Sequence, residues 1–111
     1  MKIERQTIGT VEVLAPSAPL VEEDARTFCD LLRERTGVQS PRLVVSMNDV
    51  PYMDSIALEG LLDCADDLSR RALGLRLVGV TGTCREVLEI TGIARHFRFF
   101  EDVQDAVRSF M

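Results

Sequence analysis

Short apolar runs alternate with longer amphipathic stretches through most of this 111-residue chain. Leu43-Val44-Val45 and the run from Leu75 to Val80 have the composition of buried strands, and each is followed by a stretch with helical spacing. Strands that alternate with helices pair in parallel, because each crossover helix returns the chain in the same direction. The pattern therefore predicts a layered α/β domain.

The clearest helical signal follows residue 55. Apolar residues recur there at the spacing of one helix face, at Leu58, Leu61, Leu62, Ala65, Leu68 and Ala72. Charged residues occupy the opposite face, at Glu59, Asp63, Asp66 and Arg70. We expect the first stripe to pack on the sheet and the second to face water.

The remaining segments complete this predicted domain. Residues 3–8 and 11–14 predict a hairpin that turns near Gly9, and residues 97–100 predict a last short strand. Further helices are expected over residues 21–36 and 101–111, and a third helix should open at Thr81-Gly82-Thr83. We expect one domain over residues 1–111, with a mixed, mostly parallel sheet of about four to five strands and about four helices.

Charge and cysteine usage exclude several classes of protein. The net charge is -5 and Lys2 is the only lysine, so a dense basic surface for nucleic acid is not expected. The cysteines, Cys29, Cys64 and Cys84, are odd in number, widely spaced and set among apolar residues, which favours buried reduced thiols over disulfides or metal ligands. We expect neither a metal nor a cofactor.

Membrane insertion is not predicted either. No apolar run approaches the roughly 20 residues that cross a bilayer, and the first residues lack the apolar core of a secretory signal. The expected location is the cytoplasm.

Enzyme activity is not expected. A receiver-type domain would need a lysine near a late strand, and a thioredoxin-like enzyme would need a Cys-x-x-Cys pair. The sequence has neither, and it has no Gly-x-x-x-x-Gly-Lys phosphate loop. His96 is the only histidine, too isolated for a zinc site or for a Ser-His-Asp triad.

The tripeptide Met53-Asp54-Ser55 stands where the strand at residue 43 gives way to the long helix. Helix N-termini present unpaired N–H groups and a positive dipole end, which suit a capping oxygen or a bound anion. Two interpretations are open: Asp54 or Ser55 is only an N-cap, worth about 1 kcal/mol, or Ser55 is a site of regulatory modification.

The segment from Leu43 to Ser55 resembles the strand, loop and phosphoacceptor of STAS domains, which occur in sulfate transporters and bacterial anti-sigma factor antagonists. Gly74 before a strand, Val87-Leu88, and Thr91-Gly92-Ile93 fit the same layout. Three positions differ. The family often has a small hydroxyl residue and then glycine after its acceptor, where this chain has Ile56 and Ala57, and the first position of the strand-end motif, commonly Asp or Asn, is Ser46 here.

The resemblance implies an anti-sigma factor antagonist. Its partners would be an anti-sigma factor that is also a serine kinase, and a cognate phosphatase, with Ser55 as the phosphorylated residue. The implied docking surface comprises Asp54, Ser55, Ile56, Ala57 and Glu59. A weak homodimer is a further expectation. The alternative is a constitutive STAS subunit of an ABC-type lipid transporter or another membrane transporter, which would need no phosphate.

Overall fold

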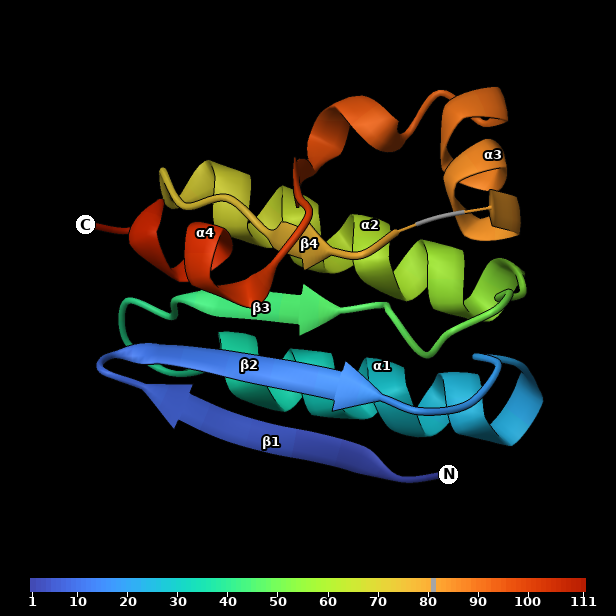
Figure 1. Ribbon diagram of the computed structural model, residues 1–111, viewed down its shortest axis with the longest axis horizontal. Coiled ribbons are helices and arrows are strands. Elements are labelled where there is room, and N and C mark those ends of the chain that lie inside the picture. The colour runs from blue at the N-terminus through green and yellow to red at the C-terminus, as the bar shows by residue number, and fades with distance from the viewer. Residues whose placement is uncertain (81) are drawn as a thin grey trace.

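The computed structural model of the chain describes residues 1–80 and 82–111. Thr81, at the predicted opening of the third helix, lies outside the described residues. The described strands form one sheet in the order β1-β2-β3-β4-β5. Their bounds are β1 Ile3–Ile8, β2 Val11–Pro16, β3 Leu43–Ser46, β4 Arg76–Val78 and β5 Arg98–Phe100. Figure 1 shows β1, β2 and β3 side by side, with α4 in front of the sheet.

The sheet is mixed, as the sequence predicted. β1 and β2 form an antiparallel hairpin in which Ile8 lies opposite Val11, and β2 to β5 all pair in parallel. The carboxyl ends of the parallel strands therefore meet at one edge of the sheet. Most of β1 is exposed, because it forms the outer edge of the sheet.

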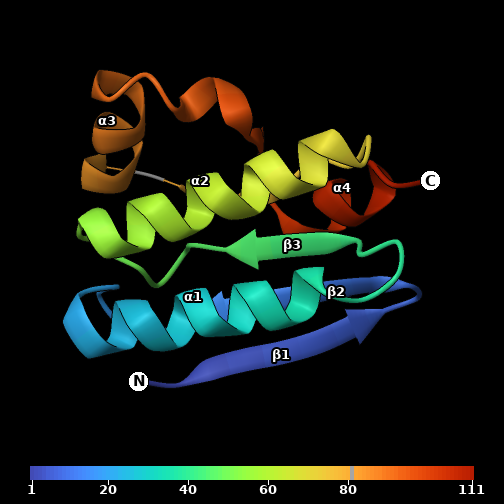
Figure 2. The ribbon, with the colours of Figure 1, turned by 180° about the vertical axis from the view of Figure 1, so that it is seen from behind.

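The helices form one layer on each face of the sheet. Figure 2 shows α1 (Glu22–Thr36) and α2 (Ser55–Arg70) together on one face, and α4 (Val103–Arg108) lies on the other face against β3, β4 and β5. α3 (Gly82–Ile90) and a short 3-10 helix, η1 (Ala94–His96), join β4 to β5. The expected four α-helices are confirmed for the described residues, whereas η1 was not predicted.

The main core lies between the sheet and the pair formed by α1 and α2. Its fully buried side chains include Leu14, Phe28, Leu32, Val45, Leu61, Leu68 and Leu77. The predicted apolar stripe of α2 is wrong at its last residue, Ala72. Ala72 lies beyond the last helical residue, is exposed, and has a left-handed φ of 59°.

A smaller core holds α4 against the opposite face. Its buried members are Val11, Val13, Val44, Val78, Ala106 and Val107. Arg76 is only 6% exposed, its guanidinium stacks 3.7 Å from the centre of the Phe110 ring, and its Nε donates to Ser109 Oγ at 3.0 Å. Arg76 therefore holds Ser109 and Phe110, which follow α4, against the sheet by hydrogen bonding and stacking.

α1 and α2 approach each other closely at Gly60. A Cβ at this position would lie 2.1 Å from Cys29 Sγ, so a glycine is needed for the observed spacing. The cysteines Cys29, Cys64 and Cys84 are buried free thiols, which confirms the prediction. Burial raises the pKa of Cys64 to about 12, since a thiolate is poorly solvated there.

Candidate functional site

The loop before α2 is tied to the loop before α1 by a short parallel bridge. Leu20 N donates to Tyr52 O at 3.0 Å, and Asp54 N donates to Leu20 O at 2.9 Å. This bridge lies beyond the carboxyl ends of β2 and β3. It brings the first residues of both helices together on one surface.

Asp54 is the N-cap of α2. Its backbone is extended, with φ -97° and ψ -177°, and its Oδ1 accepts a hydrogen bond from Ala57 N at 3.1 Å. The other oxygen, Oδ2, accepts from Glu22 N at 2.7 Å, at the start of α1. The Glu22 N–H, with the Ala57 N–H as a smaller contribution, lowers the pKa of this carboxyl from its ordinary value. One ionised carboxylate thus links the starts of two helices.

The hydrogen bond from Glu22 N to Asp54 helps to hold Glu22 in a strained backbone conformation. Glu22 has a φ of 52°, in the left-handed region that residues with a Cβ seldom adopt. Such a conformation costs on the order of 1 kcal/mol and persists where neighbouring contacts impose it. The short bond to Asp54 is one such contact.

Ser55 is the first residue of α2 and its side chain is exposed. Asp54 supplies the capping oxygen, so the Ser55 hydroxyl is not needed as a cap. Among the described residues we find no hydrogen bond from this hydroxyl. The geometry therefore fits both interpretations of the tripeptide, because each applies to a different residue. Asp54 is the N-cap, and Ser55 is exposed and accessible to an incoming protein.

The other predicted docking residues differ in exposure. Glu59 is exposed one turn after Ser55, and Ile56 is half-buried, with its carbonyl accepting from Cys29 Sγ at 3.4 Å. Ala57 is 0% exposed and belongs to the core. A partner that lies on this surface in the described conformation cannot touch the Ala57 side chain. The small, buried Ala57 side chain instead lets α2 pack against the sheet.

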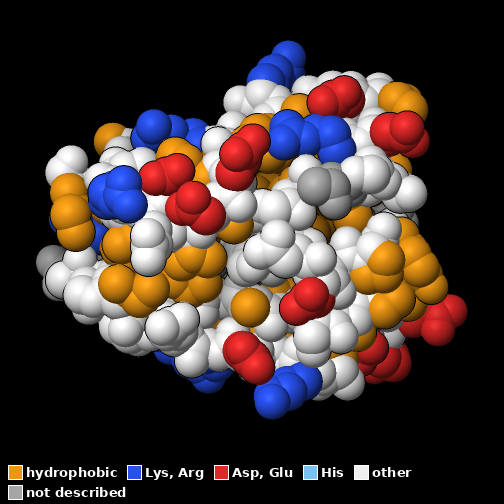
Figure 3. Space-filling model, in the orientation of Figure 1, with side chains coloured by type: hydrophobic (Ala, Val, Ile, Leu, Met, Phe, Trp, Pro, Cys, Tyr) orange, Lys and Arg blue, Asp and Glu red, His pale blue; other side chains and the backbone are white. Residues whose placement is uncertain are grey.

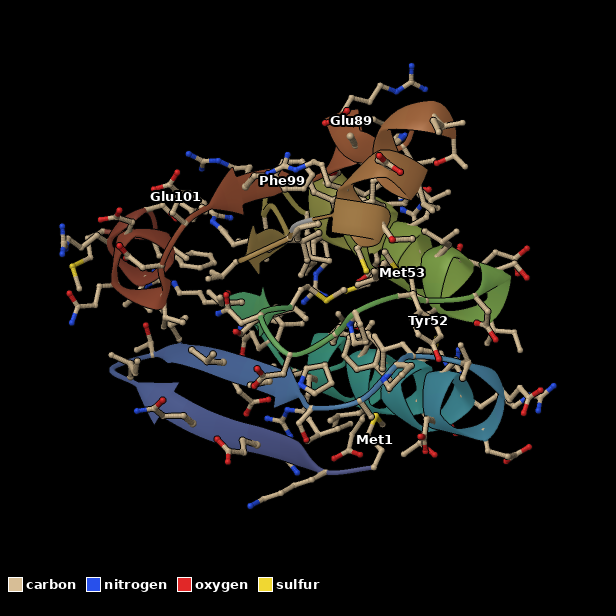
Figure 4. The ribbon with its side chains drawn as sticks, turned by 45° about the vertical axis from the view of Figure 1, so that its right-hand side comes forward. Met1, Tyr52, Met53, Glu89, Phe99 and Glu101 are labelled. Carbon is tan, nitrogen blue, oxygen red and sulfur yellow. The ribbon has the colours of Figure 1, made fainter. Side chains whose placement is uncertain are left out.

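Tyr52 is a surface residue that our reading of the sequence missed. It is 49% exposed, an unusual state for a large aromatic side chain, and it follows the exposed Pro51. Figure 4 shows Tyr52 on the loop that leads into α2, and Figure 3 shows hydrophobic and acidic side chains side by side over the starts of α1 and α2. An aromatic residue just before a helix cap was the available sequence signal.

Two kinds of feature, a cluster of metal ligands and a membrane-spanning helix, are not found in the part of the chain that is described. Residues 1–80 and 82–111 contain no group of three or more His, Cys, Asp or Glu side chains placed to hold a metal ion. Within the same residues, no helix combines the length and the apolar character that a bilayer crossing requires.

Comparison with known families gives one match over most of the chain. Residues 2–106 match the STAS domain. No curated protein sequence matches.

Solved structures share this fold at low sequence identity. A Thermotoga maritima protein is 19% identical, with a TM-score of 0.87, covering 96% of this chain and 92% of its own. An anti-sigma-factor antagonist (STAS) domain protein from Planctomyces limnophilus is 19% identical, with a TM-score of 0.81 and 96% coverage of both chains. The murine anion transporter Slc26a9 is 19% identical with a TM-score of 0.76; the likeness covers 94% of this chain but 18% of the transporter.

Proposed function

Since the chain belongs to the STAS domain family, we propose that it is an anti-sigma factor antagonist, switched by phosphorylation of Ser55. In this proposal the unmodified protein binds a kinase-type anti-sigma factor through the exposed residues Tyr52, Ser55 and Glu59, and through the exposed part of Ile56. Transcription is regulated indirectly, through release of the sigma factor. A phosphatase restores the binding form.

The exposure of Ser55 beside a cap formed by Asp54 is the observation that carries this proposal. A kinase needs an accessible hydroxyl, and a switch needs a modification that the fold tolerates. Because the cap bond to Ala57 N comes from Asp54, a phosphate on Ser55 leaves that bond in place. The positive end of the α2 dipole compensates part of the added charge.

The same phosphate would weaken the binding of a partner that packs closely over Ser55. It adds about -1.5 to -2 charges, next to the ionised Asp54 and one helical turn from Glu59. A partner packed over Ser55 would have to desolvate this group against like charges, which can cost several kcal/mol, or roughly a hundredfold in affinity.

The decisive experiment compares three single variants for binding to the cognate anti-sigma factor by calorimetry. We expect Ser55→Ala to bind like the wild type and Ser55→Asp to bind about a hundredfold more weakly. Ser69→Asp is the matched control, because Ser69 is exposed near the opposite end of the same helix. It should bind normally.

Urea denaturation of Ser55→Asp separates a switch from a folding defect. We expect stability within about 0.5 kcal/mol of the wild type, as for other exposed substitutions. Equal affinities for Ser55→Ala and Ser55→Asp would reject the switch. Intact-mass measurement of the protein from its host should show a fraction carrying one phosphate.

A second candidate is a constitutive subunit of a membrane transporter. The likeness to part of the murine anion transporter Slc26a9 supports it. In that case the start of α2 would dock on a transporter component without modification. Co-purification with a membrane-associated ATPase, together with an unphosphorylated Ser55 in the host, would favour this candidate over the first.

A further inference from the structure

A second surface feature lies at the carboxyl edge of the sheet, beside α3. It is a pocket of about 390 Å³, lined by Asn48, Gly79, Val80, Arg85, Phe99, Phe100 and Glu101. These residues come from the segments that follow β3 and β4, from α3, and from the end of β5. Ligands of open α/β sheets bind outside the carboxyl ends of the strands, and this volume is within the range of small-molecule sites.

Gly79 shapes the floor of this pocket. Its φ is 69°, and a Cβ would lie 2.0 Å from Asn48 Oδ1, so the glycine lets the Asn48 amide lie against the backbone. Asn48 Nδ2 donates to Ser46 Oγ at 3.0 Å, and Gly79 N donates to Phe100 O at 3.1 Å. These contacts fix a polar floor between the ends of the strands.

The walls combine one positive residue, one negative residue and two aromatic residues, namely Arg85, Glu101, Phe99 and Phe100. The Arg85 guanidinium stacks 4.2 Å from the centre of the Phe99 ring, which fixes its position. Figure 4 shows Phe99 between β5 and α3, and Glu101 at the end of β5. Neither Arg85 nor Glu101 forms an ion pair with any residue within the described ranges.

We infer that this pocket binds a small zwitterion, namely an α-amino acid with an apolar side chain. Its carboxylate pairs with Arg85, its ammonium group pairs with Glu101, and its side chain packs against Val80 and the aromatic wall. A ligand with only negative charge would be repelled by Glu101, and one with only positive charge would be repelled by Arg85. A zwitterion satisfies both groups, which otherwise do not pair.

The test is titration of the full chain with L-leucine, L-valine and L-phenylalanine, followed by calorimetry or NMR shifts. At least one of them should bind saturably. N-acetyl-L-leucine lacks the ammonium group and L-leucinamide lacks the carboxylate, so each should bind at least about tenfold more weakly than L-leucine. Absence of saturable binding by all three amino acids would overturn the inference.

Charge-neutralising variants assign the two ends of the ligand. Arg85→Gln and Glu101→Gln should each weaken amino-acid binding at least about tenfold. N-acetyl-L-leucine carries only a negative charge, so it should bind Glu101→Gln at least as well as it binds the wild type. Glu89→Gln and Arg95→Gln remove exposed charges outside the pocket lining and should bind normally. Unchanged affinity in both pocket variants would also reject the site. None of these outcomes bears on Ser55, which the pocket does not include.

Discussion

Replacing Asp54 with alanine should destabilise the protein through both ends of its carboxylate. Loss of the cap bond to Ala57 N costs about 1 kcal/mol. Loss of the 2.7 Å bond from Glu22 N costs about 1 kcal/mol more, because a charge-assisted bond is replaced by water at a backbone that is already strained. We therefore expect the free energy of unfolding to fall by about 2 kcal/mol in urea denaturation at pH 7.

The effect should depend on pH in a defined direction. The folded state lowers the pKa of Asp54 below its ordinary value of 3.8, mainly through the bond from Glu22 N. A carboxyl with a lowered pKa stabilises the fold above the unfolded-state value, and loses that contribution as the pH falls through the folded-state value. The difference between the wild type and Asp54→Ala should be constant near neutrality and should shrink below pH 3.8.

Asp102→Ala provides the matched control. Asp102 caps α4 through one bond, from Asp105 N to its Oδ1 at 2.8 Å, and its side chain makes no link to a second helix within residues 1–80 and 82–111. Its loss should cost about 1 kcal/mol. If Asp54→Ala cost no more than Asp102→Ala, or if its effect grew on acidification, the assignment of two stabilising bonds to Asp54 would be wrong.

Two further predictions concern the buried thiols. Gly60→Ala should destabilise the folded protein by about 1–2 kcal/mol through overlap with Cys29 Sγ, despite the better helix propensity of alanine. Adding Cys29→Ala should recover part of this loss. Additive effects of the two substitutions in a double-mutant denaturation cycle would contradict the contact. Cys64, with its pKa raised to about 12, should react with a disulfide reagent at pH 8 far more slowly in the native protein than in urea. Native reaction at the unfolded rate, located by peptide mass mapping, would count against its burial.

The fold could be predicted because its signals are local and repeated. The strand at Leu43 and the stripe of α2 each follow a simple period, and alternation of strands and helices dictates parallel pairing. Ala72 shows where this reasoning fails: the helix period continues through it, but α2 ends at Arg70 and the chain turns with a positive φ. Periodicity does not encode such an ending.

The candidate site was only partly visible in the sequence. The strand-to-helix junction marked Asp54 and Ser55, but adjacency could not say which residue caps the helix and which is exposed. The bond from Glu22 N and the burial of Ala57 depend on how α1 packs beside α2, and no local pattern reports this. The pocket beside α3 joins residues from 48 to 101, so it exists only in the folded chain.

The outermost strand limits how copies of this protein can meet. β1 is an edge strand with no strand partner along its free side, but Glu4 and Arg5 on it, with Lys2 just before, are charged and exposed. Charges on a border strand discourage another sheet from extending it. Self-association that extends the sheet along β1 is therefore disfavoured, and this border remains a solvent-facing margin.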